Sequence, residues 1–68
     1  MKLKYFEDTD TLLLTLNDHP VAETRDLSED VLVELDERGR LVSMTIEHAG
    51  QQADLREFSY QLADGSSK

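Results

Sequence analysis

The sequence predicts an α+β, mostly β protein: a small antiparallel β-meander of four to five strands with a short C-terminal helical element. Two observations support this fold class. Apolar residues recur at every second position in four segments, which is the periodicity of strands with one buried face. The segments that join them are short and rich in turn residues, so they leave no room for the crossover helices that parallel strands require.

The expected strands follow one another at short intervals. The first includes Leu3 and Tyr5, and the next three cover residues 11–16, 30–35 and 41–47. A further segment, residues 21–25, is interrupted by charged side chains, so we expect it at an edge of the sheet. The apolar residues expected on the inward face are Leu3, Tyr5, Leu12, Leu14, Leu16, Val31, Val33, Leu35, Val42, Met44 and Ile46.

The C-terminal third allows two interpretations. Asp54 and Glu57 have the spacing of a helix capping box, and the apolar residues that follow Asp54 lie near one helical face. Residues 57–62 also alternate polar and apolar side chains, which is typical of a strand. We expect a helical segment that begins between Ala49 and Asp54, and both states stay open for residues 57–62.

Length and composition limit what the chain can build. A chain of 68 residues without cysteine forms one domain with a thin core, and dimerisation is the simplest way to enlarge that core. Neither a disulfide nor a thiolate metal site is available. We expect a single small sheet domain over residues 1–63 and a flexible tail over residues 64–68, which contain little to bury.

The charge balance argues against two classes of partner. The 15 Asp and Glu residues outnumber the 7 Lys and Arg residues, so the formal net charge is −8. Such a chain repels nucleic-acid phosphates and anionic membranes, so we expect no direct nucleic-acid binding and no membrane binding. There is no signal-peptide core and no apolar run of membrane-spanning length, and we expect a cytoplasmic protein. An acidic surface does suit a basic protein partner.

The stretch LDERGRLV, residues 35–42, joins two expected strands and is interpreted as a hairpin loop. Residues 37–39 have the length of a three-residue loop whose last position is left-handed, a conformation that Gly39 adopts without penalty. Asp36 and Arg40 are expected to face each other across the loop as an exposed pair worth about 1 kcal/mol at most. Asp36 and Gly39 are therefore interpreted as structural turn residues.

A family resemblance runs through this hairpin and the strands before it. The matching elements are Tyr5, Asp10, Leu12, Leu14, Pro20 to Thr24, Leu35, Asp36, Gly39, Leu41, Val42, Ile46 and Glu47. Together they resemble the small bacterial family called Domain of Unknown Function 2283, although Phe6, His19 and Ser43 depart from its usual residues. The resemblance implies a compact, sheet-rich prokaryotic domain with no known catalytic group. Some members are suspected to be encoded beside small toxin-like proteins, which implies an antitoxin-like role.

The candidates for a metal site are weak. His19 and His48 each follow an acidic residue, and two histidines with two carboxylates are ligands that zinc accepts, but their spacing fits no metal-binding motif. The acidic turn at residues 7–10 lacks the glycine and the distal glutamate of a calcium loop. We therefore expect no metal and no cofactor, and the alternative is a small metal- or ligand-binding domain that uses His19 and His48.

Catalysis is not expected, because the serines lie in no nucleophile motif and there is no glycine-rich phosphate loop. The outward face of the sheet is more informative. Its apolar residues, the candidate interface, are Phe6, Leu13, Leu32 and Leu41. They form an exposed patch typical of a dimer contact unless the C-terminal segment covers them, and both arrangements stay open.

These observations together predict a protein–protein interaction module that is not an enzyme. Its partner is expected to be another protein or a second copy of the chain. In the first case the module is antitoxin-like and neutralises a basic toxin-like partner, and in the second it self-associates.

Overall fold

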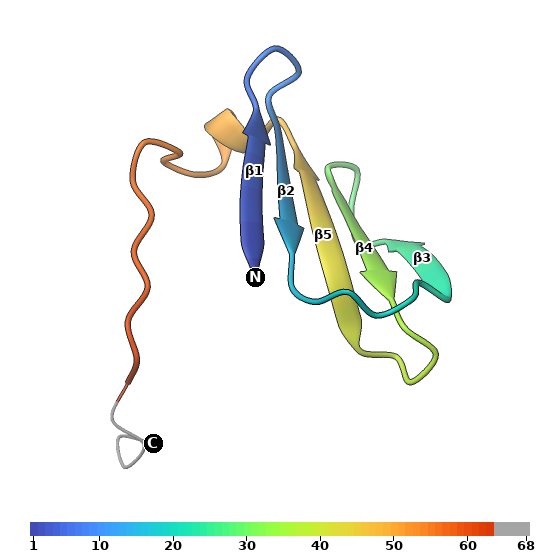
Figure 1. The fold of residues 1–68 in the computed structure, drawn as a ribbon. Helices are drawn as coiled ribbons and strands as arrows, with labels where there is room; N and C mark the ends of the chain where they lie inside the picture. Colours follow the sequence, from blue (N-terminus) through green and yellow to red (C-terminus); the bar gives the residue numbers. More distant parts are fainter. Residues whose placement is uncertain (64–68) are drawn as a thin grey trace.

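This computed structural model describes residues 1–63 of the chain, which contain five strands and one short turn of 3-10 helix. The strands are β1 (Lys2–Phe6), β2 (Thr11–Thr15), β3 (Glu23–Asp26), β4 (Val31–Leu35) and β5 (Leu41–Glu47), and the turn is η1 (Ala49–Gln51) (Figure 1). Each pair of neighbouring strands is antiparallel. The predicted fold class, a mostly β protein built on an antiparallel sheet, is confirmed.

The strand order is β1-β2-β5-β4-β3, so the sheet is not the simple meander that the sequence predicts. β2 pairs with β5 in the middle of the sheet, where Leu12 lies opposite Ile46 and Leu14 opposite Met44. Residues 16–22 carry the chain past β5 and β4 before β3 begins (Figure 1). This order gives the leucines of β2 apolar neighbours, which the polar and fully exposed strand β3 does not offer.

The connection of residues 16–22 is anchored at both ends by backbone hydrogen bonds. The Leu16 N–H donates to a carbonyl in β5 and the Ala22 N–H to a carbonyl in β4, both at 2.8 Å. β3 follows as an edge strand, as expected for the weaker segment, although it begins at Glu23 rather than at Val21. The connection thereby positions His19, which lies within it, beside the β4–β5 hairpin.

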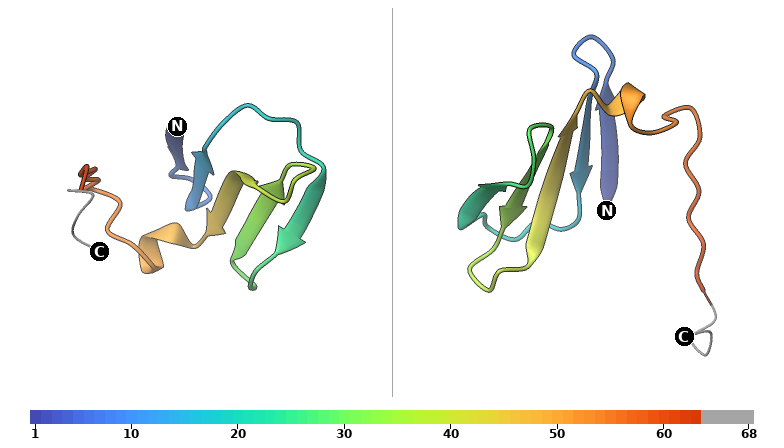
Figure 2. Two further views of the ribbon diagram at one scale, coloured as in Figure 1. Left: turned by 90° about the horizontal axis from the view of Figure 1, so that it is seen from below. Right: turned by 180° about the vertical axis from the view of Figure 1, so that it is seen from behind.

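The sheet is a single curved layer (Figure 2). Within residues 1–63 no second sheet and no helix longer than η1 is available to pack against it. The buried apolar residues are few, namely Val33, Leu35, Val42 and Ala49, and no large side chain of the described residues is fully buried. The core is therefore thin, and it lies around β4 and the start of β5.

The expected helical segment begins at Ala49, within the predicted range, but it is only the 3-residue turn η1, and the capping box predicted at Asp54 does not start a helix. The Asp54 Oδ1 instead accepts a hydrogen bond from the Arg56 N–H at 3.1 Å, which closes a local turn. Residues 57–62 form neither helix nor strand, since a short helix is marginal in water unless its apolar face is packed. The flexible tail predicted for residues 64–68 lies outside the described residues.

The segment after η1 runs away from the sheet (Figure 1). In keeping with this, the radius of gyration is 13.7 Å, whereas a compact domain of this length has about 11 Å. Nothing in residues 1–63 has the helical length and apolar character needed to span a membrane. The chain is therefore a sheet with an extended C-terminal arm, not a closed globule.

Candidate interaction surface

One face of the sheet collects the apolar residues of β1, β2, β4 and β5, and we call it the apolar face. The register fixes its members, because residues directly opposite each other on paired strands point to the same side. Leu3 lies opposite Leu14, Leu14 opposite Met44 and Met44 opposite Val33, which makes one apolar row across four strands. The inward residues predicted from the alternation thus share this face.

The apolar face is covered unevenly. The apolar side chains near β4 are buried, namely Val33, Leu35 and Val42. Solvent exposure increases toward β1, where Leu3 is 37% exposed. We call the open part the apolar patch. It consists of Leu3, Tyr5, Leu12, Leu14, Met44 and Ile46, of which the last four are half-buried and the first two exposed.

A polar clamp centred on Asp10 closes one end of the apolar patch. The Asp10 Oδ1 accepts hydrogen bonds from the Tyr5 hydroxyl at 2.5 Å and from the Gly50 N–H at 2.8 Å, and the Asp10 carbonyl accepts one from the Ala49 N–H at 3.0 Å. The Tyr5 hydrogen bond is the main reason why the pKa of Asp10 is lowered and the pKa of Tyr5 is raised. The clamp joins the β1–β2 turn to η1.

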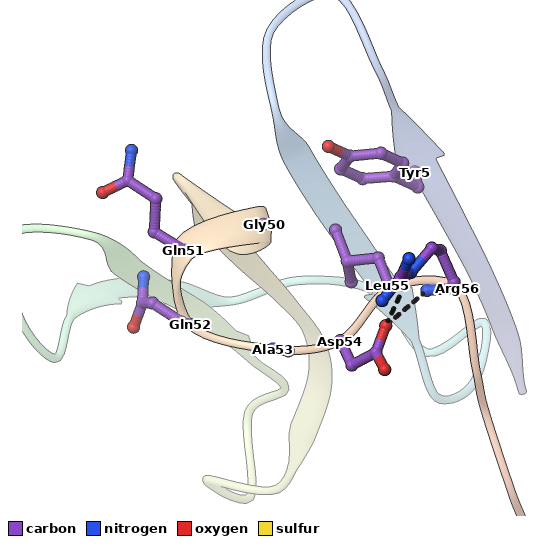
Figure 3. A pocket seen from close by; sticks show the side chains of 8 residues that line it. All are labelled: Tyr5, Gly50, Gln51, Gln52, Ala53, Asp54, Leu55 and Arg56. Atoms are coloured by element: carbon purple, nitrogen blue, oxygen red, sulfur yellow. Dashed lines mark hydrogen bonds and ion pairs between the residues drawn. The ribbon is translucent and has the colours of Figure 1, made fainter.

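A shallow hollow of about 720 Å³ lies beside this clamp, between Tyr5 and residues 50–56 (Figure 3). The side chains of Gln51 and Gln52 point away from Tyr5 in this view, and the Tyr5 hydroxyl already donates to Asp10. The charged residues that line the hollow, Asp54 and Arg56, pair with each other, with the Arg56 Nε 3.3 Å from the Asp54 Oδ1. The polar groups around the hollow are thus bonded within the chain and are not arranged to orient a small molecule.

A second, apolar hollow of about 260 Å³ lies at the edge of the apolar patch. Leu3 and Leu12 line it from the sheet, and Leu55 and Phe58 line it from the C-terminal segment. Leu55 is half-buried there, whereas the residues after it are exposed. The C-terminal segment thus reaches the rim of the patch and does not cover it.

The opposite face carries three of the four interface residues predicted from the sequence. They are Phe6, Leu13 and Leu32, whereas the fourth, Leu41, is paired with Leu35. Thr45 lies opposite both Leu13 and Leu32 and so separates them. The Lys4 Nζ lies 5.8 Å from the centroid of the Phe6 ring, and Leu41 lies beyond a register irregularity in the β4–β5 pair. The structure therefore interleaves the first three with polar residues and does not bring the four together.

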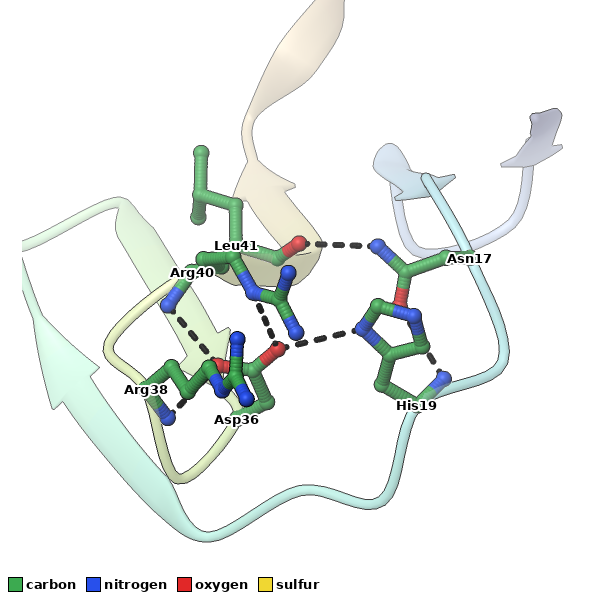
Figure 4. Close-up of polar contacts among 6 residues, drawn as sticks. All are labelled: Asn17, His19, Asp36, Arg38, Arg40 and Leu41. Atoms are coloured by element: carbon green, nitrogen blue, oxygen red, sulfur yellow. Dashed lines mark hydrogen bonds and ion pairs between the residues drawn. The ribbon is translucent and has the colours of Figure 1, made fainter.

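The carboxylate of Asp36 organises the β4–β5 hairpin (Figure 4). Its Oδ1 accepts hydrogen bonds from the N–H groups of Arg38 and Arg40 at 2.9 Å, and its Oδ2 accepts one from the Arg40 Nε at 3.0 Å. The His19 Nδ1 lies 3.1 Å from the same Oδ2 and ties the β2–β3 connection to the loop. Asp36 is only 5% exposed, so the predicted exposed pair with Arg40 is wrong for Asp36, because His19 and the loop enclose it.

These contacts set the charge state of the hairpin. The Arg40 N–H makes the largest contribution to lowering the pKa of Asp36 from 3.8 to about 2, with the His19 and Arg38 hydrogen bonds adding to it and burial opposing it. Gly39 closes the loop at φ 79°, the left-handed conformation that the loop requires, and its N–H donates to the Asp36 carbonyl at 3.0 Å. Asp36 and Gly39 both serve the geometry of the hairpin.

The two histidines lie at opposite ends of β5. His19 contacts Asp36 where β5 begins, and His48 follows the last residue of β5 in a left-handed conformation. Since β5 has 7 residues and a strand rises by about 3.3 Å per residue, the two rings share no site. The His48 Nδ1 lies 3.1 Å from the Asp30 Oδ1, and this hydrogen bond raises the pKa of His48. Residues 1–63 contain no group of three or more His, Asp or Glu side chains arranged to hold a metal ion.

Asp10 is the residue that sequence reasoning missed. The acidic turn at residues 7–10 is interpreted above only as an incomplete calcium loop. One signal was available, because Asp is among the few residues other than glycine that tolerate a left-handed conformation, and Asp10 has φ 57°. Its partner Gly50 lies 40 residues further along the chain, so no local pattern could have paired them.

Comparison with known proteins finds a match to a family model that covers most of the chain. The family described as Protein of unknown function (DUF2283) matches residues 2–49, which contain all of β1 to β5 and the first residue of η1. No curated protein and no solved structure matches.

Proposed function

Since the chain belongs to the DUF2283 family, whose description assigns no activity, we propose a function from its sheet: it is a protein–protein interaction module that docks its apolar patch on another protein chain. One observation carries this proposal. The patch is a continuous set of Leu, Met, Ile and Tyr side chains that stays open after the described residues have folded. A contiguous apolar surface rimmed by polar residues is typical of an interaction site.

In an antitoxin-like role, a basic partner would be attracted by the acidic end of the sheet, which lies beside the apolar patch and not on it. Glu29, Asp30 and Glu47 gather with His48 around a hollow of about 540 Å³. The acidic β1–β2 turn lies at the same end of the sheet, since β2 begins where β5 ends. Acidic groups beside an apolar contact attract basic side chains and accelerate association with a basic protein. The family resemblance favours the same kind of partner.

The proposed role needs no catalytic group. The apolar patch contains one polar atom, the Tyr5 hydroxyl, and that hydroxyl is bonded to Asp10. The proposal keeps the cytoplasmic location that the sequence leads us to expect and the bacterial origin that the family resemblance implies.

Co-expression with the product of the adjacent gene tests the proposal. We expect that product to co-purify with the tagged chain, and Leu3→Glu to reduce the recovered amount about tenfold by placing a charge in the contact. Phe6→Glu is the matched control, since Phe6 lies on the same strand, faces the other side and is 41% exposed against 37% for Leu3. Failure of this product and of a second copy to bind would contradict the proposed function.

A further inference from the structure

We infer that the occupant of the apolar patch is a second copy of this chain, so that two sheets stack face to face around a twofold axis. This inference rests on the proposed function and names the partner of the same surface. In such a contact the patch of one copy meets the same patch of the other, so a single apolar surface suffices for both. Stacking of two sheets about 10 Å apart is the usual way in which a one-layer sheet completes a core.

The chain exposes more surface than a closed fold of its size. The accessible surface is 5648 Å², whereas a compact monomer of this mass exposes about 4,400 Å². The excess includes the surface of the C-terminal segment that runs away from the sheet as well as that of the sheet face, which no second layer in the described residues covers. A second copy would cover this face, since each partner buries roughly 800 Å² in a stable interface.

The charges on the apolar face favour a second copy over a basic protein at this surface. Within β1 to β5 the charged residues on this face are Glu23 and Arg25, which lie opposite Leu35 and Val33. They also pair with each other, with the Arg25 Nη2 at 2.8 Å from the Glu23 Oε2, so the strands contribute no net charge to this face, and the acidic residues Asp54 and Glu57 lie only at its rim. A neutral face on a chain of net charge −8 is the side on which a second acidic copy meets the least repulsion.

The described part of the C-terminal segment, residues 52–63, does not occupy the patch. Leu55 contacts its rim, but Phe58, Tyr60 and Leu62 after it are exposed, the last to 84%. Residues 57–62 form no strand and are all exposed, so they do not pack over the apolar face. The segment flanks the patch and leaves its centre, Leu14 and Met44, open to a partner.

Net charge gives the dimer a diagnostic salt dependence. Two copies that each carry a net charge of −8 repel one another electrostatically. Added salt screens this repulsion and therefore tightens the dimer. A complex with a basic protein is held partly by attraction between opposite charges and weakens with salt. The direction of the salt effect therefore separates the two kinds of partner.

Sedimentation equilibrium of the full chain over a dilution series, at low and at high NaCl, tests the inference. We expect a monomer–dimer equilibrium that shifts toward the dimer at high NaCl. Leu3→Glu is expected to weaken dimerisation at least about tenfold, and Phe6→Glu to change it by less than about twofold. Far-UV circular dichroism checks that both variants fold, and Leu3→Gln repeats the test without a charge.

The outcomes distinguish the inference from the proposed function. A wild-type chain that stays monomeric at all concentrations overturns the inference, and so does a dimer that Phe6→Glu disrupts and Leu3→Glu does not. If the chain is monomeric but Leu3→Glu abolishes binding of the adjacent gene product, the inference fails and the proposed function stands. If Leu3→Glu affects neither kind of association, both are wrong.

Discussion

The carboxylate of Asp36 shows how one residue fixes a loop and anchors a distant segment. Two hydrogen bonds from the loop backbone and one from the Arg40 side chain hold the hairpin closed, and His19 brings the β2–β3 connection to the same carboxylate. Because Asp36 is nearly buried, it tolerates no change that leaves these donors unpaired. Its contacts position two segments of the chain relative to each other.

Asp36→Asn is expected to lower the melting temperature by about 10 °C. An amide keeps the shape of the carboxylate but replaces one acceptor with a donor. In either orientation of the amide, its NH₂ faces a donor, either the Arg40 Nε or the loop N–H groups. Thermal unfolding followed by circular dichroism measures the change. Glu37→Gln, an exposed substitution in the same loop, serves as the control, and an equal fall in both variants would contradict this role of Asp36.

The low pKa of Asp36 predicts the pH range in which the hairpin stabilises the fold. The folded-state pKa is about 2, below the ordinary value of 3.8, so ionised Asp36 contributes its full stabilisation above pH 3.8 and loses it as the pH falls toward 2. The difference in urea midpoint between the wild type and Asp36→Asn should therefore be constant above that range and shrink below it. A difference that does not change with pH would show that the charge of Asp36 is not what stabilises the hairpin.

The sequence of the loop predicted its backbone geometry correctly, but it did not predict that Asp36 is buried. The position of Gly39 follows from the three-residue loop length, because its left-handed φ is a local property of the backbone. The burial of Asp36 depends on His19, which is 17 residues earlier in the chain. No pattern within residues 35–42 reports that contact.

The element η1 depends on contacts with the β1–β2 turn. It has 3 residues, too few to be stable as an isolated helix, and it is held by the Asp10 carbonyl and carboxylate. The approach is close, since a Cβ at Gly50 would lie 2.9 Å from the Asp10 Oδ1. A methyl group at this position would therefore push the Asp10 carboxylate away from the Gly50 N–H.

Gly50→Ala is expected to destabilise the fold and lower the melting temperature by about 5 °C. The sign of this change in melting temperature is informative, because replacing glycine by alanine in a helical turn normally stabilises a protein. Hydrogen exchange of the residue 50 amide should accelerate in the variant as its bond to Asp10 is displaced. Gln51→Ala, an exposed change in the same turn, should alter neither quantity. An unchanged or higher melting temperature for Gly50→Ala would contradict the clamp.

The positions of the strands could be predicted, because they depend on local sequence patterns. The order of the strands in the sheet could not, because it depends on contacts between segments that are distant in the sequence. The alternation predicts β2, β4 and β5 nearly to the residue, because one buried face imposes a period of two. The pairing of β2 with β5 is a contact between segments some thirty residues apart, and the meander was expected because turn signals between β2 and β3 are strong. The short helical element was predicted at η1, but the helix did not continue to Asp54 and beyond, because a capping pattern does not supply a packing partner.

At the scale of the whole molecule, the sheet is a single layer, and no second layer within residues 1–63 covers its apolar face. The residues predicted to point inward share one face within the strands, whereas the interface predicted from the sequence lies on the opposite face, around Leu13 and Leu32, and stays a prediction. Both faces carry exposed apolar side chains, such as Leu3 on one and Phe6 on the other. The register distinguishes them, because it joins the residues of the apolar patch into adjacent pairs, whereas Thr45 separates Leu13 from Leu32.

The covering of the apolar patch by a second copy is the central claim, and an isotope-filtered NOE measurement on equal amounts of labelled and unlabelled chain tests it most directly. We expect intermolecular NOEs between the methyl groups of Leu14, Met44 and Ile46, because these side chains lie at the centre of the patch. Intermolecular NOEs confined to Leu13 and Leu32, or none at concentrations well above those of the sedimentation series, would contradict the claim.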